Sequence, residues 1–175
     1  MRDQNKIRRF EECVLPHLDA AYNLARWLTR SDLDAEDVVQ ESYLRAFKFF
    51  DGLRSTDSRP WLLAIVRNTY YTMIQQRRAA EEETSFDEEI HSPDSENQDP
   101  EVLLLQSINQ QLLKDAIEDL PLEFREVIVL RELEGLSYKE ISEITAVPLG
   151  TVMSRLARAR KKLQASVARY MSKEL

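Results

Sequence analysis

An acidic stretch divides this 175-residue chain into two parts. Between Glu81 and Glu101 there are ten acidic residues and no lysine or arginine, and Phe86 and Ile90 are the large apolar residues. Such a segment cannot bury a core, because like charges repel and little apolar surface is available. We therefore predict a flexible linker over residues 80–99 between two small domains, residues 1–79 and 100–175.

Both flanking parts show the spacing of amphipathic helices. Apolar residues recur three and four positions apart, strand-like alternation is scarce, and 43% of the chain is hydrophobic. An all-α fold without a sheet is therefore expected. The apolar residues that mark these helices are Ile7, Phe10 and Val14; Leu18, Ala21, Leu24 or Ala25, and Leu28; Ala35, Val38, Val39, Ala46, Phe47 and Phe50; Leu62, Ile65 and Val66, with Trp61 and Tyr70 as either core or stacking residues; Leu105, Ile108, Leu112 and Ala116; and Phe124, Val127, Ile128 and Leu130.

Proline, glycine and capping residues set the expected limits of the helices. Pro16 ends or kinks the first helix, and the polar run 52–60 reads as a loop before a helix that begins near Trp61. In the second half, Asp99-Pro100 opens a helix and Leu120-Pro121 closes it. The next helix ends at Gly135.

Residues 135–163 have the pattern of a helix-turn-helix. Ser137 and Glu140 form a capping box, so a helix should begin at Tyr138. Residues 146–148 (Ala-Val-Pro) then break it, and a second helix starts near Leu149 or Gly150.

The second helix of this motif has two kinds of surface. Val152, Leu156, Ala159 and Leu163 share one side, and a roughly opposite face carries Thr151, Ser154, Arg155, Arg158 and Lys162. From residue 151 to 173 there are seven lysines or arginines and no acid. Such a face is either simply solvated or bound to DNA, and the turn, the charge and the capping box together favour DNA.

The net charge of −7 does not oppose DNA binding. Outside the acidic stretch the chain holds 24 bases and 21 acids, a net charge of +3. The acidity is therefore confined to one segment and leaves the flanking parts free to approach nucleic acid.

Two polar surfaces of the first half remain ambiguous from the residues alone. Asp37, Gln40, Glu41 and Arg45 form a strip that could be solvated or dock a protein, and solvation is favoured. The helix after Trp61 mixes aromatic residues with cations and amides, which suits single-stranded nucleic acid, although the aromatic residues could equally be core.

Several classes of function are disfavoured. We find no signal peptide or apolar run long enough for a membrane span, so a cytoplasmic protein is expected. The single Cys13 excludes an internal disulfide and is interpreted as a small packing residue. A phosphate-cradling glycine loop, a metal cluster and a nucleophile paired with histidine are all missing from the sequence, so neither an enzyme nor a cofactor is expected.

The order of motifs resembles that of a two-domain bacterial sigma factor of the extracytoplasmic-function (ECF) type, over residues 10–167. The carrying motifs are Asp34-Ala35-Glu36-Asp37-Val38-Val39-Gln40-Glu41, Trp61-Leu62, Arg67-Asn68, Leu120-Pro121, Leu136-Ser137-Tyr138-Lys139-Glu140-Ile141, Gly150-Thr151-Val152-Met153-Ser154-Arg155 and Arg158-Ala159-Arg160. The resemblance implies sigma region 2 at residues 1–79 and sigma region 4 at residues 100–175.

The resemblance also implies a role for each surface. The strip Asp37, Gln40, Glu41 and Arg45 would bind the clamp helices of the largest subunit of core RNA polymerase, with the flap as a further contact. Residues 151–162 would read the minus 35 element, and the linker would lie near the RNA path. An anti-sigma factor is an expected partner. The residues expected at the minus 10 element are Ser55, Arg59, Arg67, Asn68, Tyr71, Arg77 and Arg78.

Some positions depart from the family pattern. Thr72 and Gln75 replace a frequent Asp and Arg, Met153 replaces a residue that is often polar or basic, and Ser142 and Ala146 stand where alanine and glycine are usual. Both turn residues remain small, so the close helix crossing should survive. The alternative interpretations are a sigma-like decoy that occupies an anti-sigma factor and a stand-alone helix-turn-helix regulator.

Overall fold

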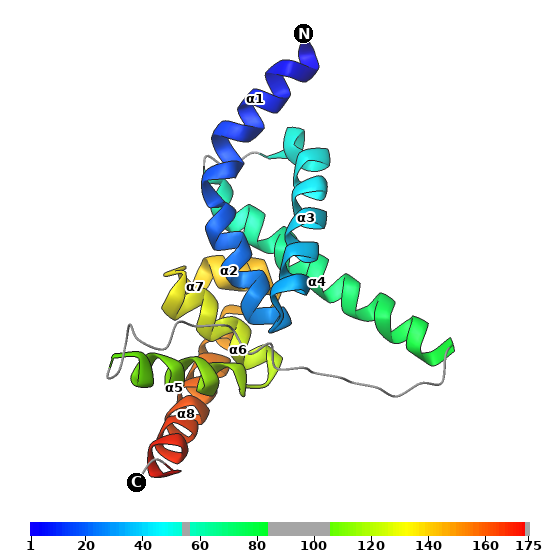
Figure 1. The fold of residues 1–175 in the computed structure, drawn as a ribbon. Helices are drawn as coiled ribbons and strands as arrows, with labels where there is room; N and C mark the ends of the chain where they lie inside the picture. The colour runs from blue at the N-terminus through cyan, green and yellow to red at the C-terminus, as the bar shows by residue number, and fades with distance from the viewer. Residues whose placement is uncertain (54–56, 84–105, 174–175) are drawn as a thin grey trace. The chain divides into compact units, whose positions relative to one another are not determined.

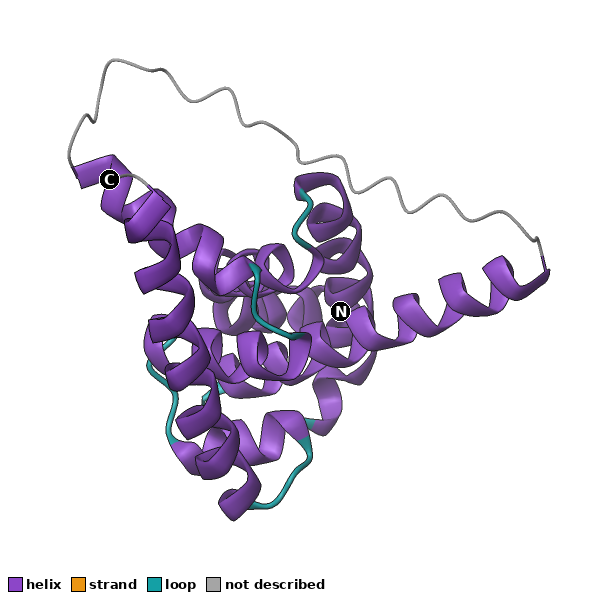
Figure 2. Ribbon diagram, turned by 90° about the horizontal axis from the view of Figure 1, so that it is seen from below, coloured by secondary structure: helices purple, strands orange, loops and turns teal. Residues whose placement is uncertain are grey.

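A computed structural model describes residues 1–53, 57–83 and 106–173 of the protein. All regular structure in these ranges is helical and they contain no strand, which confirms the expected all-α class (Figure 2). The chain forms two compact units, and each is described by itself.

The first unit comprises residues 142–146 together with the N-terminal part of the chain, whose described residues form four α-helices and two short 3₁₀ turns. They are α1 (Arg2–Val14), η1 (Leu15–His17), α2 (Leu18–Thr29), α3 (Asp32–Phe49), η2 (Phe50–Gly52) and α4 (Ser58–Glu83), and they are labelled in Figure 1. Pro16 lies inside η1, so the predicted interruption after the first helix is confirmed. Leu24, Leu28, Val38, Leu62 and Leu63 are almost fully buried and form its core.

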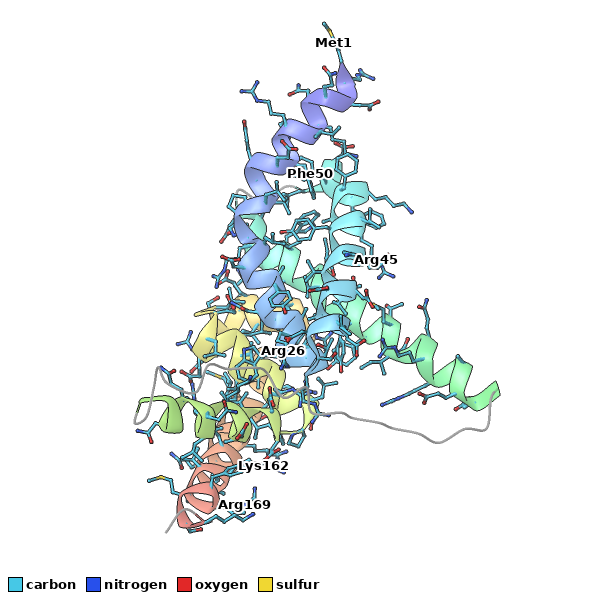
Figure 3. All side chains as sticks on the ribbon, viewed as in Figure 1. Met1, Arg26, Arg45, Phe50, Lys162 and Arg169 are labelled. Atoms are coloured by element: carbon cyan, nitrogen blue, oxygen red, sulfur yellow. The ribbon has the colours of Figure 1, made fainter. Side chains whose placement is uncertain are left out.

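An aromatic cluster joins α1 to the end of α3. The ring of Phe10 meets the rings of Tyr43, Phe47 and Phe50 edge-on, with centroid distances between 5.3 and 6.1 Å. Edge-to-face contacts of this kind contribute about 0.5–1.5 kcal/mol beyond the burial of area. Figure 3 shows Phe50 at this end of the unit.

The corner between α2 and α3 uses the acidic residues at the start of α3. Arg30 ends α2 in the left-handed region, with φ of 56°, and Ser31 caps α3 by accepting from the amide of Asp34. The carboxylate of Asp32 accepts from Nε of Arg26 at 2.6 Å, which ties the two helices together. Asp32 therefore joins two helices in addition to interacting favourably with the dipole of α3.

Three expectations for this unit were wrong. Cys13 is exposed and does not pack in the core. Phe10 and Val14 form the buried side of α1, and Cys13 lies about 100° around the helix from Val14. Ile7 and Leu18 are also exposed. Both ends of the loop expected over residues 52–60 are helical, since Gly52 belongs to η2 and α4 begins at Ser58.

The early start of α4 has a local cause. The carboxylate of Asp57 accepts from the backbone amide of Arg59 at 3.2 Å and so satisfies one of the unpaired amides of the first turn. Pro60 does not disrupt this turn, because amides there lack partners within the helix in any case.

The second unit contains α5 (Gln106–Glu118), α6 (Leu122–Ile128), the π turn η3 (Val129–Leu133), the start of α7 (Tyr138–Thr145) and α8 (Leu149–Lys173). Ala116, Leu120, Val127, Ile128 and Leu156 are among its buried core residues. Nη1 of Arg125 donates to the carbonyls of Glu118 and Leu120, so the corner at Leu120-Pro121 is held from inside. The predicted opening at Asp99-Pro100 and the core position Leu105 lie outside the described residues.

The predicted linker is described only where it meets α4. Residues 80–83, assigned to the linker from the sequence, are helical and complete α4. Residues 84–99 lie outside the described part of the chain.

Candidate nucleic-acid interfaces

The capping box that begins the helix-turn-helix is present. The amide of Glu140 donates to Oγ of Ser137 at 3.1 Å, and the amide of Ser137 donates to Oε1 of Glu140 at 3.0 Å. After α7, Ala146 adopts φ of 56°, in the left-handed region where the motif usually has glycine. The amides of Thr151 and Val152 then donate to the carbonyl of Pro148, which starts α8. The predicted helix limits are therefore confirmed.

A π turn sets the approach to this motif. The amide of Glu134 donates to the carbonyl of Val129, and that of Leu136 to the carbonyl of Leu130, both at 3.0 Å. Gly135, with φ of 68°, sits between them and permits the reversal. One extra residue is thus accommodated before α7, a feature that the helical spacing of the sequence did not reveal.

Tyr138, the first residue of α7, is held by two arginines. The guanidinium of Arg131 lies 4.6 Å from the centre of the Tyr138 ring and donates to the carbonyl of Leu136. Arg160 of α8 hydrogen-bonds to Glu132, and the pKa of Arg160 is raised first by Glu132 and then by the neighbouring Tyr138. The start of α7 is therefore fixed to the middle of α8.

The buried side of α8 agrees with the prediction, but the position of two cations does not. Val152, Leu156 and Ala159 are buried. Nη2 of Arg155 lies 3.8 Å from Oε2 of Glu123, and the ammonium of Lys162 lies 5.4 Å from the centre of the Phe124 ring. At about 100° per residue, both cations flank the buried side next to α6, so the expectation of a roughly opposite face was wrong for them.

The outward side of α8 carries a somewhat different set of residues. Ser154 and Arg158 are exposed as predicted, while Thr151 is half-buried. Met153, Ala157 and Lys161 also face outward, and half of the Met153 surface is exposed (50%). We call the exposed residues Met153, Ser154, Ala157, Arg158 and Lys161 the α8 outer face. Met153, Ala157 and Lys161 could have been predicted by measuring the angle of each residue around α8 from the buried residues, at about 100° per residue. Figure 3 marks Lys162 and Arg169 along the same helix.

The strip predicted to bind polymerase lies on α3. Asp37 and Gln40 are exposed, and Glu41 is paired with Arg45 at 3.1 Å, a partly buried contact (Figure 3). Leu33 and Leu44 share this side at spacings of three and four, and they are 71% and 69% exposed. Sequence reasoning missed these two leucines, although their place outside the apolar spacing of α3 was a visible signal.

The residues predicted at the minus 10 element divide into two groups on α4. The guanidinium of Arg67 lies 4.4 Å from the centre of the Tyr71 ring, and Asn68 and Arg78 are exposed nearby in sequence. Arg77 instead binds Asp34 of α3. Arg59 is half-buried at the start of the helix, and Ser55 lies outside the described residues.

Membrane-spanning helices and clusters of metal-binding residues are both absent from the described ranges. None of the helices in these ranges is long and apolar enough to cross a membrane. The same ranges contain no group of three or more histidine, cysteine or acidic residues that could hold a metal ion.

Comparison with known families identifies both halves. Residues 13–80 match the family described as Sigma-70 region 2, and residues 110–163 match Sigma-70, region 4. The ECF RNA polymerase sigma factor SigE of Mycolicibacterium smegmatis is 34% identical over 170 residues, which span 97% of this chain and 66% of that protein. The ECF RNA polymerase sigma-E factor of Haemophilus influenzae is 36% identical over 157 residues, spanning 85% of this chain and 81% of that protein.

Two solved structures are similar. One is the sigma factor RpoE in complex with the anti-sigma factor NepR from Bartonella quintana, with a TM-score of 0.74, 26% identity, and coverage of 92% of this chain and 98% of that one. The other is CnrH in complex with the cytosolic domain of CnrY, with a TM-score of 0.64, 25% identity, and coverage of 93% and 89%.

Proposed function

The chain belongs to the sigma-70 family of RNA polymerase sigma factors, in its ECF group, and we propose that it directs core RNA polymerase to a specific set of promoters. The observation that carries this proposal is the capped helix-turn-helix, whose second helix exposes cations and no acid. The same chain contains another helical unit, in which α4 carries aromatic and cationic side chains such as Tyr71 and Arg67.

The minus 35 contact is assigned to α8. The N-terminal turns of the second helix of such a motif enter the major groove, so the α8 outer face would meet base edges there. Arg158 and Ser154 can donate to bases or phosphates. Arg155 and Lys162, which lie next to α6, would reach the phosphates at the edge of the groove rather than its floor.

The minus 10 contact is assigned to α4 and to Ser55, which precedes it in the sequence. The ring of Tyr71 with the Arg67 guanidinium over it offers a base a stacking surface and a phosphate a cation. Promoter opening then needs no bond to be made or broken. Binding to unpaired bases favours the open state over the duplex, and this difference in affinity shifts the equilibrium.

The polymerase contact is assigned to the α3 strip, extended by Leu33 and Leu44. Two exposed leucines among acidic and amide side chains suit the centre and rim of a protein interface. We assign this strip to the clamp helices of the largest subunit, with region 4 reaching the flap. Such a role implies a cytoplasmic protein, and the similarity to the sigma factor RpoE of Bartonella quintana, which was solved with the anti-sigma factor NepR, supports an anti-sigma partner.

Reconstituted transcription on a promoter library tests the proposal. Core polymerase with the chain is expected to start transcription at a shared pair of minus 35 and minus 10 sequences that core alone ignores. Absence of initiation, together with tight binding to an anti-sigma protein, would instead favour a decoy. DNA binding without any effect on polymerase would favour a stand-alone regulator.

Matched variants separate the two surfaces. Glu41→Arg reverses a charge in the α3 strip and is expected to weaken binding to core polymerase while leaving duplex binding by the free chain unchanged. Glu12→Arg reverses a charge on the exposed side of α1 and serves as the control. Equal loss of polymerase binding in both variants would remove the α3 strip from the interface.

A further inference from the structure

The last part of α4 extends beyond the core of its unit. Leu62, Leu63, Val66 and Thr69 are buried, whereas all residues from 75 to 82 are exposed. Figure 1 shows this part of α4 running on past α3. We call residues 75–82 the α4 arm. Apolar packing therefore does not hold the arm.

Charge also works against the end of this helix. Glu81, Glu82 and Glu83 occupy its last turn, which contains no basic residue. The C-terminal end of a helix is the negative end of its dipole, so the carboxylates of Glu81 and Glu82 there disfavour the helical state. Without another contact, a terminal segment of this kind would fray.

One bidentate ion pair supplies such a contact. Nη2 of Arg77 donates to Oδ1 of Asp34 at 2.9 Å, and Nη1 donates to Oδ2 at 3.4 Å. The hydrogen bond with Asp34, with smaller contributions from the charges of Asp34 and Asp37, raises the pKa of Arg77. Asp34 is itself fixed, because its amide donates to Ser31 at the start of α3. The pair therefore connects the arm to a rigid point.

The arm has a second side that matters for nucleic acid. Arg67, Tyr71 and Arg78 follow one another at spacings of four and seven residues, so they share one stripe along about 16 Å of helix. Arg77 lies about 100° away from Arg78 and points to α3. The side chain that binds Asp34 is thus not the one that continues the stripe.

We propose that the Arg77–Asp34 pair is a positioning contact, which keeps the α4 arm helical so that Arg78 stays in line with Arg67 and Tyr71 for single-stranded DNA. The proposal rests on the proposed function of α4. It gives Arg77 a different role from the direct minus 10 contact expected from the sequence.

The rival explanation predicts the opposite change in DNA affinity for Asp34→Asn. If Arg77 itself bound a phosphate, Asp34 would compete with the DNA, and Asp34→Asn would strengthen binding. If the pair positions the arm, Asp34→Asn weakens binding, as Arg77→Gln does. The control is Glu36→Gln, which removes an exposed carboxylate from the same turn of α3 without touching the pair.

Binding of full chain with core polymerase to a single-stranded oligonucleotide carrying the selected minus 10 sequence is measured by fluorescence anisotropy. We expect Asp34→Asn and Arg77→Gln each to lower affinity about threefold to fivefold, because an exposed pair is worth little more. Arg78→Ala is expected to lower affinity similarly in the parent chain and to have no further effect when added to Asp34→Asn. Glu36→Gln should leave affinity unchanged.

Hydrogen exchange on the free full chain reports the arm directly. Amides of residues 75–82 are expected to exchange faster in Asp34→Asn and Arg77→Gln and at the parent rate in Glu36→Gln. Tighter DNA binding by Asp34→Asn, independent effects of Asp34→Asn and Arg78→Ala, or unchanged exchange would each overturn the proposal. If Asp34→Asn does not fold, the exposed Arg77→Gln replaces it in the same cycle. Absence of oligonucleotide binding by the parent complex would count against the proposed function itself.

Discussion

Arg160 of α8 donates two hydrogen bonds to the same carboxylate oxygen of Glu132, from Nε at 3.2 Å and from Nη2 at 2.9 Å. The two residues are far apart in sequence, and Glu132 belongs to the π turn before the helix-turn-helix. One guanidinium therefore connects the π turn to the middle of α8. The orientation of α8, the second helix of the helix-turn-helix, therefore depends on the Arg160–Glu132 contact as well as on its buried residues.

The first prediction concerns the strength of this contact. Glu132→Ala, Arg160→Ala and the double variant should give a coupling free energy of about 0.2–1 kcal/mol, as found for exposed ion pairs with good geometry. Urea unfolding of all four chains at low salt provides the measurement. The Arg8–Glu12 pair, one turn apart on α1, is the reference and should couple less strongly. Strictly additive losses would show that the pair is not energetically significant.

The second prediction concerns the turn between α7 and α8. Ala146 has φ of 56°, and a left-handed conformation costs a residue with a Cβ about 1–2 kcal/mol. Glycine removes this cost but adds about 0.4–1 kcal/mol of chain entropy in the unfolded state. Ala146→Gly is therefore expected to stabilise the protein by up to about 1 kcal/mol, measured by urea unfolding.

A second alanine provides the control for this glycine. Ala165 is exposed within α8, where glycine should cost about 1 kcal/mol. Ala165→Gly is thus expected to shift the unfolding midpoint in the opposite direction. If both variants lost stability equally, the strain at Ala146 would be negligible.

The part of the structure that could be predicted from sequence is the part determined by neighbours in the chain. The capping box at Ser137 and Glu140, the break at Pro148 and the buried residues Val152 and Leu156 all follow from spacings of a few residues. Ala146 takes the left-handed conformation in this break, at a position where the family pattern usually has glycine. Local patterns were therefore sufficient for the helix-turn-helix.

Contacts between helices could not be predicted in the same way. An acid at the start of a helix suits the positive end of the helix dipole, so Asp34 needs no distant partner to explain it, and its pairing with Arg77, 43 positions later, depends on how α3 and α4 pack. Likewise, Arg155 leans toward Glu123 of α6, which no periodicity within α8 reveals. The face of a helix that remains available for binding is decided by such neighbours.

The third prediction concerns base preference at the minus 35 element. Met153 is half exposed on the α8 outer face and offers an apolar thioether, which fits the methyl group of thymine in the major groove. Replacing one thymine of the element by deoxyuridine should weaken duplex binding by the full chain by about 0.8 kcal/mol, the usual worth of one buried carbon. Anisotropy with a series of singly substituted duplexes identifies the position.

Variants of Met153 show whether this side chain makes the contact. In Met153→Ala the same deoxyuridine substitution should have little effect, because no apolar atom reaches the methyl group. Met171→Ala, at an equally exposed methionine near the end of α8, should keep the full sensitivity. A deoxyuridine effect that persists in Met153→Ala would assign the thymine contact to another residue.

The fourth prediction concerns stability at alkaline pH. Burial, with a smaller effect from Asp19, raises the pKa of Tyr43 to about 12, and its hydroxyl donates to the carbonyl of Val14 at 3.3 Å. The unfolded chain releases this proton near its ordinary pKa of about 10, before the folded chain does. The contribution of Tyr43 to stability is therefore complete below about pH 10 and is lost as the pH rises toward 12.

Tyr43→Phe should be slightly less stable at pH 8, because the hydrogen bond is missing, and should lose less stability between pH 10 and 12. Urea unfolding of both chains across this range makes the comparison, and parallel curves would show that Tyr43 titrates alike in the folded and unfolded states.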